Sequence, residues 1–353
     1  MRKPSQPFAF RPIDLRAASD AEYAQLNAFK NILRREILPE DPPKPLAYDT
    51  ERFKATPAMV QNASWGLWDQ AGAALLAFCR TDIFNTGDNP HMIDFMIEVL
   101  PGQRRQGIAT AMLRLAAEQA RSQGRRVLTT ECNDRVPAGG GFMSRLGGRM
   151  GLAITLTQLR IADIDQALVD RWLEREAELS ADFSLGFWDG RYPEDAVEGV
   201  ATLEREAGRD EPRDTLDMEP VNYTPETIRQ MEAIRLSAGN QRWTIYVSER
   251  SSGVLAGLTE VFWNPNNPTI VQQSFTGVLP DYRNRGLGRW LKAAMLKKIL
   301  RDRPQAVFIR TGNANSNAPM LKLNNALGFT RHMAEAVWQV ELESVEQYLA
   351  SRL

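Results

Sequence analysis

Apolar and polar positions in the first half of the chain follow two different periods. Alternation with a period of two predicts strands, and apolar residues three or four positions apart predict helices. The predicted strands are 8–16, 63–69, 72–82, 91–100, 127–130 and 151–159. The predicted helices are 20–38 and 108–123, with a short one after the glycines at 139–141, and the prolines between 39 and 45 mark a loop.

The second half repeats this order around one long insertion. The predicted helices are 162–180, a helix that starts at Thr224-Pro225, and 286–302; the predicted strands are 241–249, 253–263, 269–279, 306–310 and 335–342. The segment from Asp189 to Glu219 is mostly acidic, and two interpretations stay open: a solvated surface insertion, or a lid that attracts a cationic amine. Each half therefore predicts an α/β unit, a mixed twisted sheet flanked by helices.

One eleven-residue pattern occurs at equivalent places in the two halves, at Val99–Ala109 and at Val278–Gly288. In both copies a proline, an arginine, a glycine and a small residue keep the same spacing, and the second copy lies 179 positions after the first. A period of this length is typical of a domain rather than of a solenoid repeat. We therefore expect two homologous domains, at 7–158 and 159–353.

The repeated pattern has the properties of an anion-binding turn. A strand ends where Pro101 or Pro280 removes a backbone donor, and Gly107 or Gly286 then permits a positive φ. A helix follows, and the free N–H groups of its first turn favour phosphate. Arginines in the turn add charge-assisted hydrogen bonds. Each copy therefore predicts a pyrophosphate site.

Two other phosphate-binding motifs do not fit. Gly102 and Gly107 have the glycine spacing of a P-loop, but Ile108-Ala109 stands where Lys-Ser/Thr is required. No Gly-x-Gly-x-x-Gly follows a predicted strand, so a dinucleotide fold is not supported.

Arg-x-x-Gly-x-Gly/Ala after a strand that ends in Val-x-Pro resembles the acetyl-CoA signature of the GCN5-related N-acetyltransferase (GNAT) family. Asn317–Phe329 is similar to the family's late helix and its Leu-Gly-Phe ending, and Gly141–Gly148 is a reduced form of it. The chain most resembles the tandem-domain members, of which mycothiol synthases are the known type. The resemblance implies two tandem GNAT-like domains, with acetyl-CoA as co-substrate and no metal.

The residues that this resemblance implies in acetyl-CoA binding belong to the two loops and to the late helix. In the second domain they are Val278, Arg283, Asn284, Arg285, Gly286, Leu287, Gly288 and Asn317. In the first domain they are Val99, Arg104, Arg105, Gln106, Gly107, Ile108 and Ala109. The basic residues of the helix after the second loop, Lys292 among them, are expected mostly on a solvated face, with one or two near its start close to the 3′-phosphate of CoA.

The chain has 353 residues, 43% of them hydrophobic, which is enough for two cores of ordinary size. Its net charge of −1 does not indicate nucleic-acid binding. Cys79 and Cys132 are the only cysteines, which excludes a disulfide framework; Cys132 is expected to be a core residue. The two histidines form no zinc motif. Since no apolar run reaches membrane length and no signal-peptide core is present, we expect a cytoplasmic protein. Its oligomeric state, a monomer or a homodimer, is left open by the sequence.

The resemblance implies transfer of an acetyl group from acetyl-CoA to a primary amine of a small molecule or peptide. Such a transfer needs a base to take a proton from the amine and a backbone N–H to polarise the thioester carbonyl. Family members often place a tyrosine, as the acid, four residues before the glycine of Leu-Gly-Phe. That position holds Asn324 in the second domain and Met143 in the first, so a tyrosine acid is not expected here.

The base is not fixed by any motif. Mycothiol-synthase-like enzymes carry a carboxylate near the position of Gln272; because glutamine is not a base, we do not expect a mycothiol synthase. The catalytic candidates of the second domain are Glu260 on the preceding strand, and Glu219 and Tyr223 from the flexible side; a structural role is equally open for each. The first domain offers Asp94 and Glu98, on one face of a strand, with Glu131 on the next strand.

Catalysis is expected in the second domain, because its signature is fuller. The first domain lacks the closing phenylalanine and has Gly139-Gly140-Gly141 in its late helix, but its intact loop keeps the reverse assignment open. A non-catalytic acyl-CoA-binding or sensing protein is the alternative function.

Overall fold

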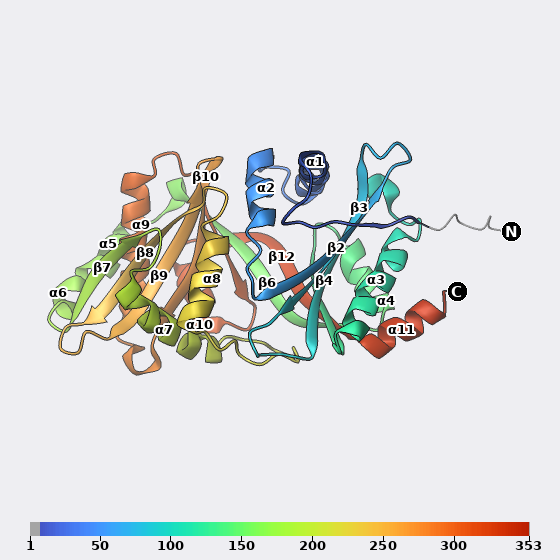
Figure 1. Ribbon diagram of the computed structural model, residues 1–353. Helices are drawn as coiled ribbons and strands as arrows, with labels where there is room; N and C mark the ends of the chain where they lie inside the picture. Colours follow the sequence, from blue (N-terminus) through green and yellow to red (C-terminus); the bar gives the residue numbers. More distant parts are fainter. Residues whose placement is uncertain (1–7, 353) are drawn as a thin grey trace. The chain divides into compact units, whose positions relative to one another are not determined.

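The computed structural model describes residues 8–352 and divides into two compact units. Unit 1 comprises residues up to Gly151 together with Thr215–Asp217 and Ala336–Leu353; unit 2 comprises Leu152–Asp214 and Met218–Glu335. The first residue of the predicted domain 7–158 and the last of 159–353 lie outside the described residues. Figure 1 labels the helices and strands.

Unit 1 is a sheet with helices on both faces. Its strands run in the order β1-β2-β3-β4-β5, with the C-terminal part of β12 next to β5. The strands are β1 (Arg11–Pro12), β2 (Val60–Trp68), β3 (Leu75–Phe84), β4 (Met92–Val99), β5 (Val127–Asn133) and β12 (Thr330–Glu341). The helices are α1 (Asp20–Ile37), α2 (Leu46–Lys54), α3 (Ile108–Ser122), α4 (Ala138–Arg145) and α11 (Leu342–Ala350).

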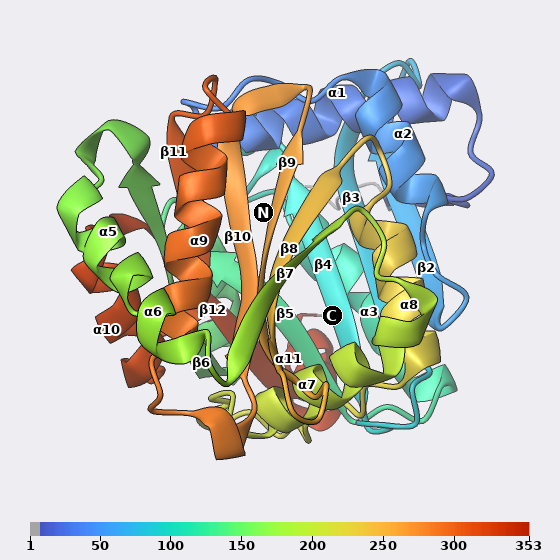
Figure 2. The ribbon, with the colours of Figure 1, turned by 90° about the vertical axis from the view of Figure 1, so that its left-hand side faces the viewer.

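Unit 2 repeats this layout with the strand order β6-β11-β10-β9-β8-β7, and Figure 2 shows α9 running along its sheet. The strands are β6 (Arg149–Arg160), β7 (Phe183–Asp189), β8 (Gln241–Glu249), β9 (Leu255–Asn264), β10 (Asn267–Val278) and β11 (Phe308–Ala314). The helices are α5 (Gln166–Glu174), α6 (Glu176–Leu179), α7 (Val197–Arg209), α8 (Pro225–Arg235), α9 (Leu287–Asp302) and α10 (Ala318–Ala326).

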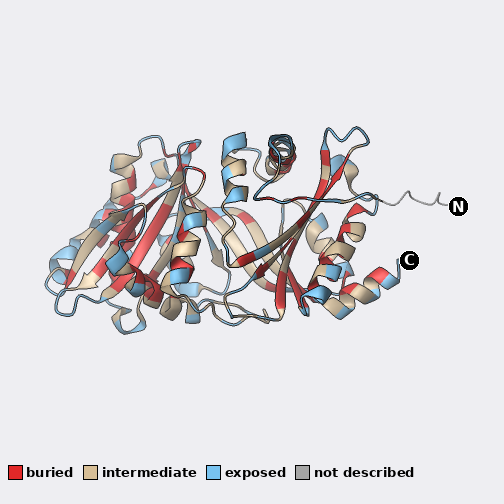
Figure 3. Cartoon of the chain, viewed as in Figure 1, coloured by how far each residue is buried: buried red, intermediate tan, exposed pale blue. Residues whose placement is uncertain are grey.

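Each sheet separates two apolar cores, and the buried positions follow the strands (Figure 3). In unit 1, adjacent residues of β3 point to opposite faces: Phe78 packs in the core with α1, and Cys79 in the core with α3. In unit 2, Val261 of β9 packs in the core with α9, and Leu258 in the core with α7.

The last strands of the two halves are exchanged between the units. β6 follows α4 in the chain but pairs antiparallel with β11 in unit 2, from Ile154 to Arg160. β12 follows α10, yet its residues from Ala336 onward belong to unit 1, as does α11, whose Val345 is fully buried there. The compact units therefore do not coincide with a cut between 158 and 159, which stays a prediction for the boundary of the sequence repeat.

The acidic segment is the main difference from the predicted elements. Residues 189–219 are not a solvated insertion, because α7 lies within them and packs Val197, Val200 and Leu203 into a core. The predicted strand at 8–16 reduces to β1, two residues long, and α2 follows the proline loop. The segment is acidic overall, yet its apolar residues recur at helical spacing, and they form the buried face of α7.

Candidate functional site

The two repeated loops have the same backbone conformation. Arg105 and Asn284 both adopt positive φ, at 66° and 62°, and Gly107 and Gly286 follow at 89° and 93°. In each unit the helix begins directly after that glycine, at α3 or α9. The predicted turn is therefore formed twice, with the first N–H groups of a helix facing out of it.

The first arginine of each loop is paired within the protein and holds the loop in shape; we call such a residue a brace. Arg104 donates from Nε to the carbonyl oxygen of Val99 at 3.1 Å, and its guanidinium binds both carboxylate oxygens of Glu36 at 2.6 Å. Arg283 likewise donates from Nε to Val278 at 3.1 Å and binds Asp210 at 2.5 Å. In both units this arginine ties the loop to the end of the preceding strand and to a carboxylate outside the loop.

Arg175 covers the loop of unit 2. A Cβ added to Gly286 would lie 3.0 Å from a guanidinium nitrogen of Arg175, so the Arg175 side chain lies directly over this glycine, whose positive φ of 93° itself favours glycine. A Cβ on Gly107, by contrast, would meet nothing within 4 Å. Unit 2 therefore has an additional cation at the N-terminus of its helix, and no local sequence pattern identified it, because Arg175 lies far from Gly286 in the chain.

The other predicted binding residues occupy the loop rim and the first helical turn. Exposed on the rim are Arg105, Gln106, Asn284 and Arg285; buried at the first helical position are Ile108 and Leu287; half-buried beside them are Ala109 and Gly288. Asn317 is the N-cap of α10, and its side chain accepts from the backbone N–H of Met320 at 3.3 Å.

The two central parallel strands of each unit pair over only three residues and then part. In unit 1 the β4–β5 ladder ends at the pair Asp94 and Thr129. In unit 2 the β10–β11 ladder ends at Gln272 and Arg310. Beyond these pairs the strands diverge, on the side where the repeated loop and its helix follow.

β10 carries a bulge that β4 lacks. Gln273 pairs with Val261 and Thr276 with Thr259, so two residues, Ser274 and Phe275, stand opposite the single residue Glu260. The β3–β4 register, by contrast, is unbroken over its whole length.

Gln273 takes part in this irregularity. Its Nε2 donates to the backbone oxygen of Glu260 at 2.8 Å and to the hydroxyl of Thr259 at 3.1 Å. The side chain of Gln273 is therefore hydrogen-bonded to the backbone of β9 at the bulge.

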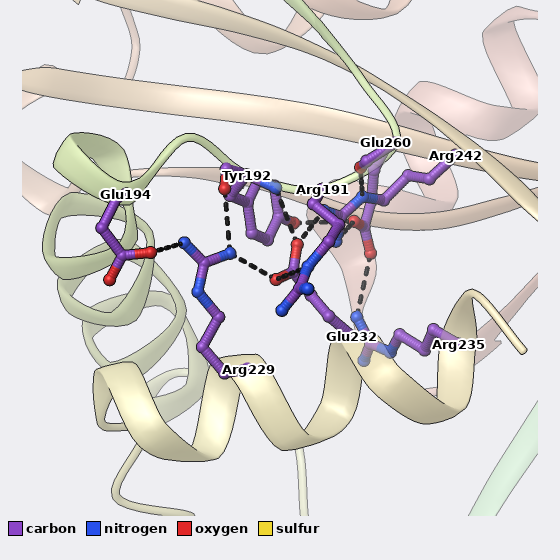
Figure 4. A network of polar contacts seen from close by, with 9 residues as sticks. Arg191, Tyr192, Glu194, Arg229, Glu232, Arg235, Arg242 and Glu260 are labelled. Carbon is purple, nitrogen blue, oxygen red and sulfur yellow. Dashed lines mark hydrogen bonds and ion pairs between the residues drawn. The ribbon is translucent and has the colours of Figure 1, made fainter. Parts of the chain in front are cut away.

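Glu260 lies in a buried network of charges (Figure 4). Its carboxylate is fully buried, accepts from the hydroxyl of Tyr192 at 2.8 Å and from Arg235 at 3.1 Å, and lies 3.7 Å from Arg242. Arg242 in turn binds Glu232. Both oxygens of Glu260 are engaged within the protein, so the predicted role of a base facing a substrate is not favoured by its contacts.

Glu204 of α7 is a carboxylate that the sequence reasoning missed. It is 5% exposed and lies beside Tyr192, Ile228 and Arg235. Burial is the main cause that raises the pKa of Glu204 to about 7, and the nearby Arg235 opposes it. The only sequence signal for Glu204 is the helical spacing of the apolar residues around it within the acidic segment.

The remaining candidates of unit 2 lie on the segment after α7. Burial raises the pKa of Tyr223 to about 12, so its hydroxyl stays protonated at neutral pH. Glu219 is exposed and takes part in further interactions. The roles of Tyr223 and Glu219 remain predictions.

In unit 1 the three carboxylates have separate environments. Asp94 accepts from the hydroxyl of Thr129, and burial raises the pKa of Asp94 to about 6. Glu98 is paired with Lys30 of α1, and Glu131 is exposed. Burial also raises the pKa of the Cys132 thiol to about 11, which disfavours a nucleophilic thiolate.

The fold and the paired loops resemble those of tandem GNAT proteins. Residues 26–147 match the profile of the acetyltransferase (GNAT) family, and residues 273–339 match that of FR47-like protein. Residues 26–147 are therefore similar to a GNAT acetyltransferase domain, and residues 273–339 to an FR47-like domain. No curated protein matches the chain by sequence.

Several solved structures share the fold over nearly the whole chain. A tandem GNAT protein from the clavulanic acid biosynthesis pathway is 22% identical, with a TM-score of 0.76 over 95% of this chain and 99% of that one. A GCN5-related N-acetyltransferase from Sphaerobacter thermophilus is 14% identical, with a TM-score of 0.64 over 94% and 96% of the two chains. A glucosamine N-acetyltransferase region of a fungal β-N-acetylglucosaminidase is 12% identical, with a TM-score of 0.63 over 95% of this chain and 38% of that one.

Within 8–352, no group of three or more His, Cys, Asp or Glu side chains is placed to hold a metal ion. None of the helices described is long and apolar enough to cross a membrane.

Proposed function

We propose that the protein transfers an acetyl group from acetyl-CoA to a primary amine, and that the reaction takes place in unit 2. The observation that carries this proposal is the bulge of β10 opposite Glu260. It lies where β10 has already parted from β11, so a backbone N–H there can donate to a thioester carbonyl between the strands. Unit 1 has the same opening of its strands but no bulge.

The loop of unit 2 supports acetyl-CoA as the donor. The N-terminus of α9 and the guanidinium of Arg175 both favour a pyrophosphate, and Arg283 holds the loop in shape. The loop of unit 1 has the same backbone without the covering arginine, which supports a second acyl-CoA site there without catalysis.

Glu204 replaces Glu260 as the proposed base. A carboxylate with a pKa of about 7 is ionised in half of the molecules at neutral pH and still accepts a proton readily. Phe275 of the bulge packs against the core that α7 forms, so the helix that carries Glu204 lies against this part of β10. Tyr223, a catalytic candidate from the sequence whose hydroxyl is protonated at neutral pH, is now proposed as the acid that protonates the departing thiolate.

One observation favours catalysis in unit 1 instead. Asp94 ends the β4–β5 ladder, as Gln272 ends the β10–β11 ladder, so unit 1 has a carboxylate where unit 2 has an amide. The pKa of Asp94, raised to about 6, also suits a base. The reverse assignment therefore rests on Asp94.

The test of the proposed function is thiol release from acetyl-CoA by the full chain in the presence of a panel of primary amines. An acetyltransferase releases CoA in an amine-dependent manner and forms an equal amount of acetylated amine. Binding of acetyl-CoA in calorimetry without thiol release above background would instead support an acyl-CoA-binding protein.

A further inference from the structure

Lys292 lies inside unit 2 rather than on the solvated face predicted for it. The residue is 3% exposed, on α9, and its Nζ donates to Oδ1 of Asn324 on α10 at 3.0 Å. Burial, rather than a neighbouring cation, lowers the pKa of Lys292 to about 8. An ammonium group in the interior is costly, and one neutral amide acceptor offsets little of that cost.

The contact continues to a third element. Asn324 is 1% exposed and donates from Nδ2 to Oδ1 of Asn313 on β11 at 2.7 Å. Asn313 is half-buried and lies three residues beyond Arg310, where the β10–β11 ladder ends. Lys292, Asn324 and Asn313 thus form a hydrogen-bonded chain from the centre of α9 to the diverging part of β11; we call it the amide relay.

Unit 1 has apolar residues at all three positions. α3 and α9 begin at Ile108 and Leu287, which aligns Leu113 with Lys292. The equivalent ladders of β5 and β11 align Cys132 with Asn313, and the Leu-Gly pairs that end α4 and α10 align Met143 with Asn324. Leu113 and Met143 are buried in one apolar core, against which Cys132 packs. The fold therefore does not need polar groups here, and unit 2 has them for another reason.

The direction of the hydrogen bonds in the amide relay indicates why unit 2 has polar groups at these positions. The Oδ1 of Asn313 is turned toward Asn324, so its Nδ2 is turned to the opposite side of the amide. The ammonium of Lys292 polarises the whole chain toward stronger donation at that far end. A donor with partial positive character beside diverging strands suits an electron-rich atom of a ligand chain between them.

We propose that the amide relay holds Asn313 Nδ2 as a donor to the pantetheine end of acyl-CoA in unit 2, and that Lys292 and Asn324 are positioning residues. This inference rests on the proposed function. In the transfer, the amine lone pair forms a bond to the thioester carbon and the C–S bond breaks with its electron pair on sulfur. The amine proton passes to the base, and the thiolate takes a proton from Tyr223, the proposed acid. The donor at the end of the amide relay stabilises the negative charge that develops on the sulfur as the C–S bond breaks.

The closing experiment separates this role from a structural one. The double variant Lys292→Leu/Asn324→Met introduces the residues of unit 1, so it is expected to fold with at least the stability of the parent chain. Lys292→Leu alone leaves the Asn324 oxygen unpaired and is expected to be less stable than the double variant. All variants are made with Ala109→Glu, so that only the loop of unit 2 binds ligand.

Two ligands are titrated by calorimetry: CoA, and adenosine 3′,5′-bisphosphate, which lacks the pantetheine. For the double variant we expect CoA to bind about tenfold more weakly, while the affinity for adenosine 3′,5′-bisphosphate stays within about twofold. Unchanged CoA affinity, or an equal loss for both ligands, would overturn the relay. If the expected affinities are found but the parent chain acetylates no amine, the relay stands and the proposed function fails.

Discussion

Arg235, the last residue of α8, forms an ion pair with the fully buried Glu260, with a guanidinium nitrogen 3.1 Å from a carboxylate oxygen. Arg242, itself 1% exposed, lies 3.7 Å from the other oxygen. The pair links α8 to β9 at the point opposite the bulge of β10. This relationship favours a structural role for Glu260, and Glu204 on α7 is the proposed base.

Glu260→Gln is therefore expected to affect stability first. Removing one partner of a buried ion pair leaves an uncompensated charge, which typically costs about 3–5 kcal/mol. Urea unfolding measures the free energy of unfolding. Asp170→Asn, which removes a surface pair with Lys297 at 2.6 Å, is the matched control and should cost about 0–1 kcal/mol. A Glu260→Gln protein that is fully stable but inactive would restore Glu260 as the base.

Glu204→Gln is expected to change the pH dependence of kcat. A base must be ionised, so kcat of the parent chain should rise with pH through about 7, the raised pKa of Glu204. The variant should lose at least about tenfold in kcat at pH 8 and lose this rise. Glu206→Gln, which removes the pair with Arg209 on the same helix, is the control. An unchanged pH–rate profile in Glu204→Gln contradicts the assignment.

Asp94→Asn is expected to stabilise unit 1 above pH 6. Because the folded pKa of Asp94 is raised, the folded chain holds a proton that the unfolded chain loses, so stability falls as pH rises from about 4 to about 6. A rise from 3.8 to about 6 corresponds to about 3 kcal/mol. Urea unfolding at pH 4 and pH 7.5 should show this fall in the parent chain and a smaller one in the variant. Loss of acetyl transfer in Asp94→Asn would instead favour catalysis in unit 1.

Arg283→Lys tests whether this arginine braces the loop or binds phosphate. Lysine keeps the charge but cannot bind Val278 and Asp210 together, as the guanidinium does. A brace predicts that Arg283→Lys weakens acetyl-CoA binding nearly as much as Arg283→Ala, by about tenfold. Calorimetry measures the affinity of both variants for acetyl-CoA. If Arg283 instead contacted phosphate directly, Arg283→Lys would largely keep the affinity of the parent chain.

The elements of the fold could be predicted where the information is local. The loops are an example: proline, glycine and arginine at fixed spacing determine a turn whose positive φ values recur at Gly107 and Gly286. The strands before them follow from their alternation. The helix α7 could not be predicted in this way, because acidic residues dominate the segment that contains its buried Val200 and Leu203.

The site was less predictable because its chemistry depends on register and on contacts between distant residues. One extra residue in β10 produces the bulge, and no composition reveals which strand carries it. Arg175 reaches Gly286 only through packing of the end of α5 against the loop. Lys292 has the sequence neighbours of a solvated helix face, yet its side chain is buried and donates to the amide of Asn324 on a distant element.

The most direct test of the central claim compares Gly288→Glu with Ala109→Glu. The two residues occupy the same position in the first turn of α9 and α3, and a glutamate there places negative charge where the pyrophosphate would bind. The measurement is kcat/KM for acetyl-CoA, with an amine that the parent chain accepts. Catalysis in unit 2 predicts that Gly288→Glu lowers kcat/KM by at least about 100-fold and Ala109→Glu by less than about threefold. The opposite ranking would contradict the account and place the reaction in unit 1.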